Sequence, residues 1–332
     1  MSVMAKGNVL YHYAGMDKAI KILTYKNLRL SDITKSNDMN EMSIFIPGIF
    51  DEMLKCYDER GGFSNKFVYR RKTGKKALEM LVENLKTRIT KELEEGKIST
   101  FVICFSEEGD LLSQWRGYAD NGKGMCLGFS VDELMKFVGD STETGFALEK
   151  VEYLSREQAN EKVHKFAYGI IDMIEQILGK IKAGNIKCGK GSAFAEEMDE
   201  VLYYAMLGLI EESIKFKSAG FKEEKEWRFF IRNSLNKDEL EKKTYTLIGG
   251  ISQGARKKVS EYVADNINFN IKENDIIPYV TWNFEKFHDK IICDVVCGPN
   301  NTIRERDLEL FLRKYEYKEC EYRKSGITYI VR

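Results

Sequence analysis

Hydrophobic positions near the start of the chain follow first a strand period and then a helical one. Alternation over residues 9–13 predicts a short strand, and apolar residues recurring near helical spacing predict a helix over 17–25. A second short strand is expected over 28–31. Beyond it, Asn37-Asp38 with Glu41 at capping-box-like spacing predicts the start of another helix, because these side chains satisfy free backbone N–H groups.

The next part of the chain alternates between helical and strand patterns. An amphipathic pattern predicts a helix over 75–95, and the continuous apolar run over 99–106 predicts a buried central strand. A helix is expected over 110–118. The Asn121-Gly122 turn signal then leads into a strand over 124–129. We expect the two strands of this segment to be neighbours around the short helix.

Residues 155–218 differ in character from the rest. Two helical patterns, over 156–182 and 193–217, flank the glycine-rich segment 184–191, and predict a helical hairpin inserted into, or packed upon, a mixed sheet. Later elements are expected as strands at 226–232, 244–248, 276–282, 291–297 and 327–331, and as a helix at 302–314.

Short strands set among helices indicate an α+β fold rather than a doubly wound one. We expect a mixed, mostly antiparallel central sheet with a long helical insert. Residues 1–154 and 219–332 would then be two parts of one core, and residues 155–218 would be the insert, which is also a candidate surface for homo-oligomer contacts.

Composition is that of an ordinary globular chain of 332 residues, with 43% hydrophobic residues. Lysine plus arginine equals aspartate plus glutamate, at 52 each, so no overall charge attracts nucleic acid or an anionic membrane. The N-terminus lacks the apolar run of a signal peptide, and no stretch reaches the roughly 20 apolar residues of a membrane span. We therefore expect no membrane partner.

Cysteine and histidine usage bears on compartment and metal content. The seven cysteines are an odd number and contain no C-x-x-C pair, and three histidines argue against a clustered zinc site. We expect a reducing, cytoplasmic location and no metal.

The first candidate for chemistry is the opening strand, where alternation places Tyr11 and Tyr13 on one face and His12 on the other. One interpretation is a hydrogen-bonded histidine among core aromatic residues. The other is a neutral imidazole that binds a sugar hydroxyl.

The second candidate follows the central strand. Ser106 precedes a polar turn, and the helix after it carries Gln114, Trp115, Arg116 and Tyr118. A strand-to-helix junction offers free N–H groups to an anion. Trp115 and Tyr118, three residues apart, form either a core stripe or a stacking platform.

The third candidate is the charged segment that contains Glu224, Glu226 and Arg228. If both glutamates enter the strand they share a face, and repulsion between them would raise the pKa of one when the pair is desolvated. The alternative is a solvated charge run. The chain contains none of the common motifs of phosphate-binding loops, dinucleotide-binding folds, serine hydrolases or zinc proteases.

These segments together resemble a bacterial family, the domain of unknown function 2971 (DUF2971). The matching motifs are Leu10-Tyr-His-Tyr13, Leu28-Arg-Leu-Ser-Asp32, Asn37-Asp38 with Glu41, Cys104-Phe-Ser106 with Leu111-Leu-Ser-Gln-Trp-Arg-Gly-Tyr118, Gly124-Met-Cys-Leu-Gly-Phe129, Phe221-x-x-Glu-x-Glu-Trp-Arg228 and Cys297-Gly-Pro299. They span most of the chain outside the helical insert, and the Ser-Gln-Trp-Arg segment is the most specific.

The order of these motifs is similar to that of ADP-ribosyltransferases, and the similarity implies NAD as substrate and no metal. Glu226, Glu224 and His12 would be catalytic. The residues that would bind NAD or a related nucleotide are Tyr11, Tyr13, Ser106, Gln114, Trp115, Arg116, Tyr118 and Arg228. A carboxylate would stabilise the positive charge that develops on the ribose as nicotinamide leaves.

The resemblance thus implies an NAD-consuming ADP-ribosyltransferase or NAD glycohydrolase, with a macromolecular acceptor in the first case, acting as a toxin or phage-defence effector. The alternative is a non-catalytic sensor or adaptor that binds a nucleotide or a phage component. A nuclease ranks lowest, because no acidic metal-binding motif is recognisable. The enzyme hypothesis requires His12 and Glu226 to face one nucleotide-sized hollow.

Overall fold

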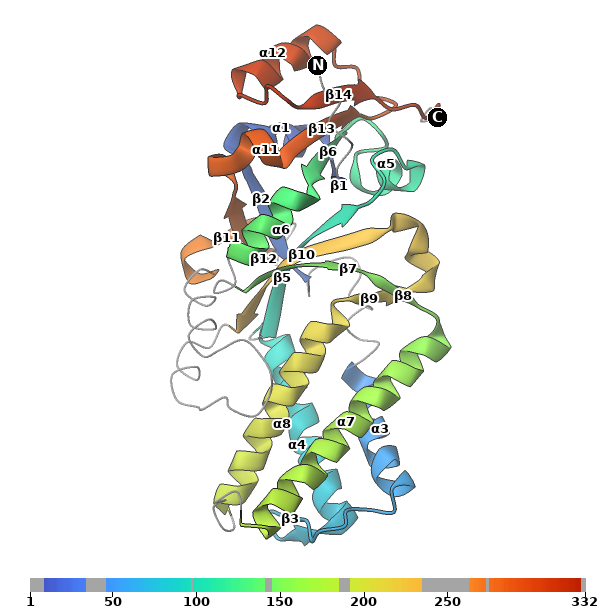
Figure 1. Ribbon diagram of the computed structural model, residues 1–332, viewed down its shortest axis with the longest axis vertical. Helices are drawn as coiled ribbons and strands as arrows, with labels where there is room; N and C mark the ends of the chain where they lie inside the picture. Colours follow the sequence, from blue (N-terminus) through green and yellow to red (C-terminus); the bar gives the residue numbers. More distant parts are fainter. Residues whose placement is uncertain are drawn as a thin grey trace.

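A sheet of ten strands runs through the upper half of the molecule (Figure 1). The computed structural model describes residues 9–33, 46–96, 98–140, 145–184, 192–234, 263–272 and 275–329. The sheet consists of β1 (Val9–Ala14), β2 (Asn27–Asp32), β5 (Ile98–Ser106), β6 (Met125–Ser130), β7 (Phe146–Lys150), β10 (Glu226–Ser234), β11 (Ile267–Lys272), β12 (Asp275–Asn283), β13 (Ile292–Cys297) and β14 (Glu321–Lys324). Its pairs are antiparallel, except that β13 and β14 run parallel.

Helices cover both faces of this sheet and extend below it. They are α1 (Met16–Tyr25), α3 (Ile46–Glu59), α4 (Gly74–Glu94), α5 (Leu112–Tyr118), α6 (Val131–Asp140), α7 (Arg156–Lys182), α8 (Ser192–Ser213), α11 (His288–Ile291) and α12 (Glu305–Lys314), with 3-10 turns η2 (Ala219–Glu224) and η3 (Glu285–Phe287). Two short strand pairs lie apart from the sheet: β3 (Val68–Tyr69) with β4 (Lys72–Thr73), and β8 (Glu152–Leu154) with β9 (Phe216–Ser218).

The sheet forks at β5. One edge of β5 pairs with β10 over its whole length. The other edge is shared, because β2 pairs with it at Val102 and β1 pairs with it at Ser106. One branch continues from β2 to β12 and β11, and the other from β1 to β6, β13 and β14. The three residues of β5 between these two contacts therefore face the opening of the fork, which α1 bridges as it connects β1 to β2.

Two hydrophobic cores lie on opposite faces of the sheet. On one face α1, α6, α11 and α12 contribute buried side chains that include Ala19, Leu134, Ile291 and Leu308. On the other face the core is mostly helical and reaches the sheet at Val102 and Phe230, among others. Alternation along β5 and β10 explains this division, because successive side chains of a strand point to opposite faces.

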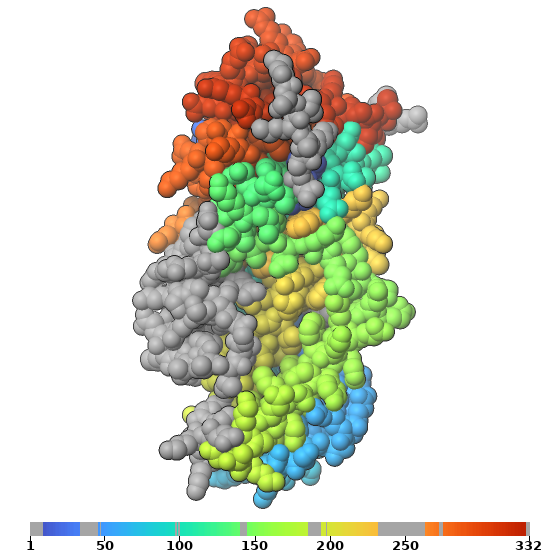
Figure 2. Space-filling view, viewed as in Figure 1, coloured from blue at the N-terminus to red at the C-terminus, as the bar shows by residue number. Residues whose placement is uncertain are grey.

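The helical core is shared by α3, α4, α7 and α8, which form the elongated lower half of Figures 1 and 2. The helix α7 begins with a capping box, in which Ser155 Oγ accepts from the Gln158 N–H and the Gln158 side chain accepts from the Ser155 N–H. Its buried positions, such as Val163, Ile170 and Ile174, recur at helical spacing. The segment 155–218 thus packs together with α3 and α4, which lie far earlier in the chain.

The predicted α+β class, the mostly antiparallel sheet and the long helical insert are confirmed. The expected strands at 9–13, 28–31, 99–106, 124–129 and 226–232 all appear, each within about two residues of its predicted bounds. The expected helices at 75–95 and 156–182 also appear. The helix start at Asn37-Asp38 and the strand at 244–248 lie outside the described residues. None of the helices in the described part of the chain combines the length and apolarity needed to cross a membrane.

Three expectations were wrong or incomplete. The strands 99–106 and 124–129 are not neighbours, because β1 lies between β5 and β6. Residues 327–329 are not in a strand; β14 precedes them and pairs with β13. The helices α3 and α6 and the strands β7 and β11 were not anticipated. The buried positions of α3, such as Ile49 and Met53, do recur at helical spacing in the sequence.

Candidate functional site

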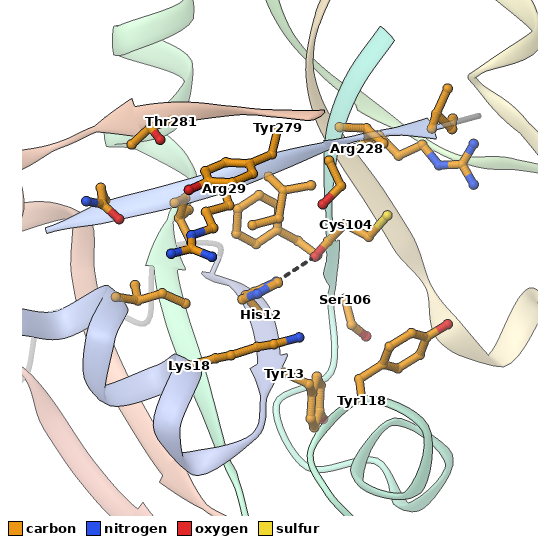
Figure 3. Close-up of a pocket in the computed structure, with 18 of the residues that line it drawn as sticks. His12, Tyr13, Lys18, Arg29, Cys104, Ser106, Tyr118, Arg228, Tyr279 and Thr281 are labelled. Atoms are coloured by element: carbon orange, nitrogen blue, oxygen red, sulfur yellow. Dashed lines mark hydrogen bonds between the residues drawn. The ribbon is translucent and has the colours of Figure 1, made fainter. Parts of the chain in front are cut away.

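A cleft of about 650 Å³ opens in the fork and continues across β5 to β10 (Figure 3). Its walls come from α1, β1, β2, β11 and β12 on one side of β5, and from β9, η2 and β10 on the other. This volume is typical of sites for nucleotide-sized molecules. The sequence-predicted residues that line it are Tyr11, His12, Tyr13, Ser106, Gln114, Tyr118, Glu224, Glu226 and Arg228.

His12 is fixed in the fork by a backbone group that the sheet leaves open. Its Nδ1 lies 3.0 Å from the Cys104 carbonyl oxygen, which faces the gap between β1 and β2. A carbonyl oxygen only accepts, so Nδ1 carries the hydrogen and Nε2 is left as an acceptor. Burial and the nearby Lys18 ammonium hold the pKa of His12 below its usual range, against the effect of the Cys104 hydrogen bond. At neutral pH the imidazole is uncharged.

Two cations that sequence analysis did not select lie beside His12. Lys18 on α1 and Arg29 on β2 both line the cleft and are exposed (Figure 3). The Arg29 guanidinium carbon lies 4.6 Å from the centre of the Tyr279 ring. Neither cation has a carboxylate partner among the residues that the structure describes. Together with His12 they form the fork arm of the cleft, which has the donors to bind an anion such as phosphate.

On the other side of β5, charged groups bind one another instead. Glu226 accepts from Arg228 Nε at 2.7 Å through Oε1 and from Lys217 Nζ at 3.0 Å through Oε2. Lys217 also donates to Glu224 Oε2 at 2.7 Å, and Arg228 donates to the Ile214 carbonyl at 2.6 Å. Glu226, Lys217 and Arg228 are 4%, 5% and 3% exposed. We call Lys217, Glu224, Glu226 and Arg228 the ion cluster; its two positive and two negative charges balance.

The structure does not show the expected repulsion between Glu224 and Glu226. Burial opposes ionisation of Glu226, but Arg228 and Lys217 outweigh it and hold the pKa of Glu226 below its usual range. Glu224 does not enter the strand; it ends η2, and Lys225 in a left-handed conformation separates it from β10. Lys217 then bridges the two carboxylates. Glu224 Oε1 has no hydrogen-bond partner among the described residues.

In three of the predicted site residues, the polar side-chain atoms are hydrogen-bonded to neighbouring groups of the protein. Ser106 Oγ donates to the Glu224 carbonyl at 2.7 Å and accepts from the Glu108 N–H. The Tyr13 hydroxyl donates to the Glu108 carbonyl and accepts from the Leu111 N–H, and Trp115 Nε1 donates to Asp110. The N–H groups of this turn are therefore largely occupied and do not form the expected anion site.

Trp115 and Arg116 do not line the cleft. The Trp115 ring is fully buried and packs edge-on against Tyr13, so it belongs to a small core and not to a stacking platform. Arg116 is exposed elsewhere on α5. Tyr118, three residues after Trp115, is 55% exposed and lines the cleft, where burial and Glu224 raise the pKa of its hydroxyl to about 12. Tyr11 donates to Asp294 at 3.2 Å.

His12 and Glu226 approach the cleft from opposite sides of β5. Tyr11, Ser106 and Glu226 lie opposite one another across three strands and share a face, so His12 points to the other face. Cys104 lies between them: its carbonyl oxygen accepts from His12, and its thiol contacts the Glu226 carboxylate. The Cys104 side chain is exposed in the cleft, but desolvation by the surrounding protein and the nearby Glu226 carboxylate raise the pKa of its thiol.

Part of the chain is similar to a known protein family. The model of the family described as "Protein of unknown function (DUF2971)" matches residues 114–229. This confirms the family resemblance over that part of the chain, which runs from α5 into β10. No curated protein and no solved structure matches the chain.

Proposed function

We propose that the cleft binds NAD or a related nucleotide and that the protein consumes it, as an ADP-ribosyltransferase or an NAD glycohydrolase. The observation that carries this proposal is the fork arm. Lys18 and Arg29 offer two cationic groups that have no carboxylate partner among the described residues, beside a neutral His12 whose Nε2 can accept from a hydroxyl. A nucleotide supplies both the phosphates and the ribose hydroxyl that this arrangement can recognise.

The chemistry of the proposed reaction assigns a role to Glu224. The bond between the ribose carbon and nicotinamide nitrogen breaks, and its electron pair leaves with nicotinamide. Water or an acceptor side chain forms the new bond to the ribose carbon and gives up a proton. Glu224 Oε1 has no partner in the part of the chain that the structure describes, so in this proposal it stabilises the sugar cation and orients that nucleophile. Glu226, with both oxygens paired, would position Glu224 through Lys217.

A second candidate is a sensor or adaptor that binds the nucleotide without cleaving it. The pairing of Glu226 with Arg228 and Lys217 favours this alternative, because a neutralised carboxylate stabilises a developing cation poorly. The approach of His12 and Glu226 from opposite sides of β5 also favours it. Either activity would suit a toxin or phage-defence protein, in which nucleotide binding or consumption responds to infection.

The two candidates differ in nicotinamide release. The purified protein is incubated with NAD, with and without cell lysate as a source of acceptor, and free nicotinamide is measured. The enzyme proposal expects release by the wild type and a loss of about 10²–10³ in rate for Glu224→Gln with the fold intact. The matched control is Glu223→Gln, an exposed neighbour outside the cleft, which should release nicotinamide at the wild-type rate.

Binding of NAD without any release would favour the sensor. If the wild type neither binds NAD nor releases nicotinamide, both candidates are wrong. Expression in bacteria adds a readout in the cell: growth arrest that Glu224→Gln relieves supports a toxin, whereas arrest that persists in this variant contradicts a catalytic origin.

A further inference from the structure

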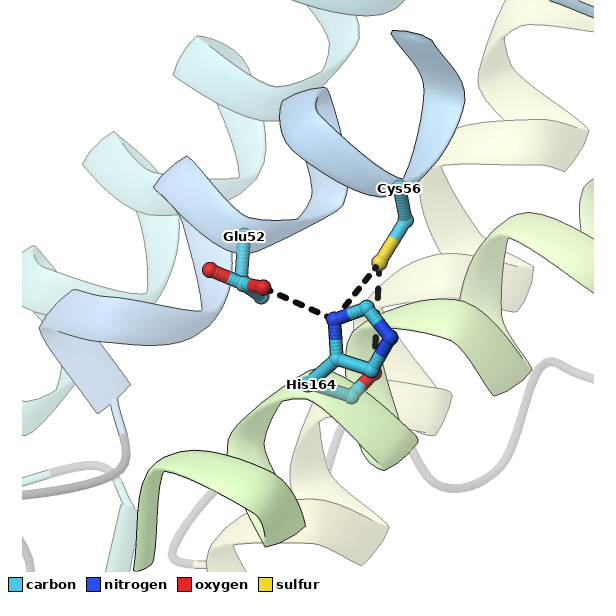
Figure 4. Close-up of side chains that lie close together, drawn as sticks. All are labelled: Glu52, Cys56 and His164. Atoms are coloured by element: carbon cyan, nitrogen blue, oxygen red, sulfur yellow. Dashed lines mark hydrogen bonds and ion pairs between the residues drawn. The ribbon is translucent and has the colours of Figure 1, made fainter. Parts of the chain in front are cut away.

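A second cluster of reactive side chains lies in the helical half, away from the cleft. Glu52 and Cys56 are one turn apart on α3, and His164 faces them from α7 (Figure 4). Glu52 Oε1 lies 2.8 Å from His164 Nδ1, and Cys56 Sγ lies 3.7 Å from the same nitrogen. All three donor atoms lie within 4.8 Å of one another. None of these residues lines the cleft.

These separations suit three ligands of one metal ion. Zinc bonds of about 2.0–2.3 Å in tetrahedral geometry place neighbouring donor atoms roughly 3.2–3.8 Å apart. The separations of Nδ1 from Oε1 and from Sγ are close to this range, and Oε1 and Sγ lie within 4.8 Å of each other, so side-chain movements of up to about 1 Å would admit an ion. A thiol, an imidazole and a carboxylate are also the donor types that zinc takes in proteins.

The surroundings direct the donor atoms toward a common point. Lys55 donates to Glu52 Oε2 at 2.7 Å, which leaves Oε1 on the side of His164. The Cys56 side chain is fully buried, so its sulfur cannot turn out to solvent. The His164 side chain is 44% exposed, and a fourth position is therefore open to water.

The geometry points to a binding site for one zinc ion, or a divalent ion of similar preference, held by Glu52, Cys56 and His164 with water as fourth ligand. Bound there, the ion would tie α3 to α7 and stabilise the helical core. This site differs from the sequence expectation of no metal. That expectation rested on histidine number and on the lack of C-x-x-C pairs, neither of which detects a site assembled from two helices that are over 100 residues apart.

Metal binding at this site releases a proton. Zinc binds cysteine as the thiolate, so a bound ion displaces the proton of the Cys56 thiol. His164 Nδ1 and Glu52 Oε1 share one hydrogen in the free site, and both atoms must be without it to bind the ion. The imidazole then carries its hydrogen on Nε2. Affinity is therefore expected to fall as pH falls.

The test uses the full chain, freed of metal with a chelator. Zn²⁺ binding is measured by equilibrium dialysis, and Co²⁺ is added separately to detect a sulfur-to-metal charge-transfer band. We expect one ion per chain, a thiolate band with Co²⁺, and a Tm that rises with Zn²⁺. Cys56→Ser and His164→Gln should each weaken binding by at least about tenfold.

The matched control is Cys293→Ser, which removes a half-buried thiol from the sheet and should bind zinc as the wild type does. His164→Gln guards against loss of fold, because its side chain is partly exposed and glutamine retains polar atoms. No saturable zinc binding by the wild type would overturn the proposal. Equal binding by wild type, Cys56→Ser and His164→Gln would also overturn it.

Discussion

The ion cluster and the fork arm flank the same strand, β5, and use their charges in opposite ways. In the ion cluster, Glu226 and Arg228 are buried and bind each other, and Lys217 links them to Glu224. In the fork arm, Lys18 and Arg29 are exposed and have no carboxylate partner among the described residues. Charges that neutralise one another inside the protein serve the fold, whereas charges that face an open cleft are available to a ligand.

Residues that look alike in sequence differ in their hydrogen-bond partners in these two regions. Arg228 and Arg29 both line the cleft, but Arg228 already donates to a carboxylate and a carbonyl. Substitutions in the ion cluster should therefore change the free energy of unfolding, and substitutions in the fork arm should change ligand affinity.

The largest expected effect is from Glu226→Gln. Removing this buried charge leaves Arg228 and Lys217 without their shared partner, and breaking such a pair costs about 3–5 kcal/mol of unfolding free energy. The measurement is urea unfolding at pH 7, with Glu223→Gln as control because its side chain is exposed. A Glu226→Gln variant as stable as this control would show that the ion cluster does not support the fold.

Acid should act on the same cluster in the wild type. The pKa of Glu226 is lowered in the folded protein from an ordinary value of 4.5, so its contribution to stability is present above about pH 4.5 and is lost as pH falls through the folded pKa. We expect urea midpoints of the wild type to decline below pH 4.5, and to decline less steeply in Glu226→Gln. Equal slopes in the two proteins would contradict the assignment.

His12→Ala should have an intermediate effect, since it removes the hydrogen bond to the Cys104 carbonyl at a cost of about 1 kcal/mol. The folded pKa of His12 lies below 6.5, so the stability contributed by its neutral form is complete above pH 6.5 and is lost as pH falls through the folded pKa. A proton NMR titration should place the His12 midpoint below 6.5. A midpoint above 6.5 would mean that the imidazole is charged in the cleft.

The smallest effect on stability is expected for Lys18→Ala and Arg29→Ala. Both side chains are exposed, so the free energy of unfolding should stay within about 0.5 kcal/mol of the wild type. The measurement is again urea unfolding, with Arg116→Ala as control. A loss as large as that of Glu226→Gln would erase the distinction between the two regions.

Much of the fold was predictable because long periodic segments dominate it. The pattern of α7 and the apolar run of β5 each indicate their element from local sequence alone. The order of strands was not predictable in the same way. Nothing local in the sequence around β5 or β6 says that β1 inserts between them, since pairing depends on contacts between distant segments.

The sequence predicted which residues line the site better than it predicted how they are arranged. His12, Tyr118, Glu224 and Glu226 were selected from motifs and do line one cleft. What the two glutamates can do depends on their ion pairs, which include Lys217. This residue lies on β9, and no sequence signal distinguishes it from other lysines. Arg29 lies within the matching motif 28–32, and its position on a strand beside the fork could have directed attention to it.

Whether the cleft binds a nucleotide can be measured by calorimetric titration of ADP-ribose into the protein, because this molecule has the phosphates and ribose of NAD but no nicotinamide to release. We predict saturable binding of one molecule per chain, retained in Arg116→Ala and weakened in the Lys18→Ala, Arg29→Ala double variant. A hydrogen bond to a charged group contributes about 1.5–3 kcal/mol, so the affinity for ADP-ribose should fall at least tenfold. No binding by the wild type, or equal affinity in the double variant, would contradict this prediction.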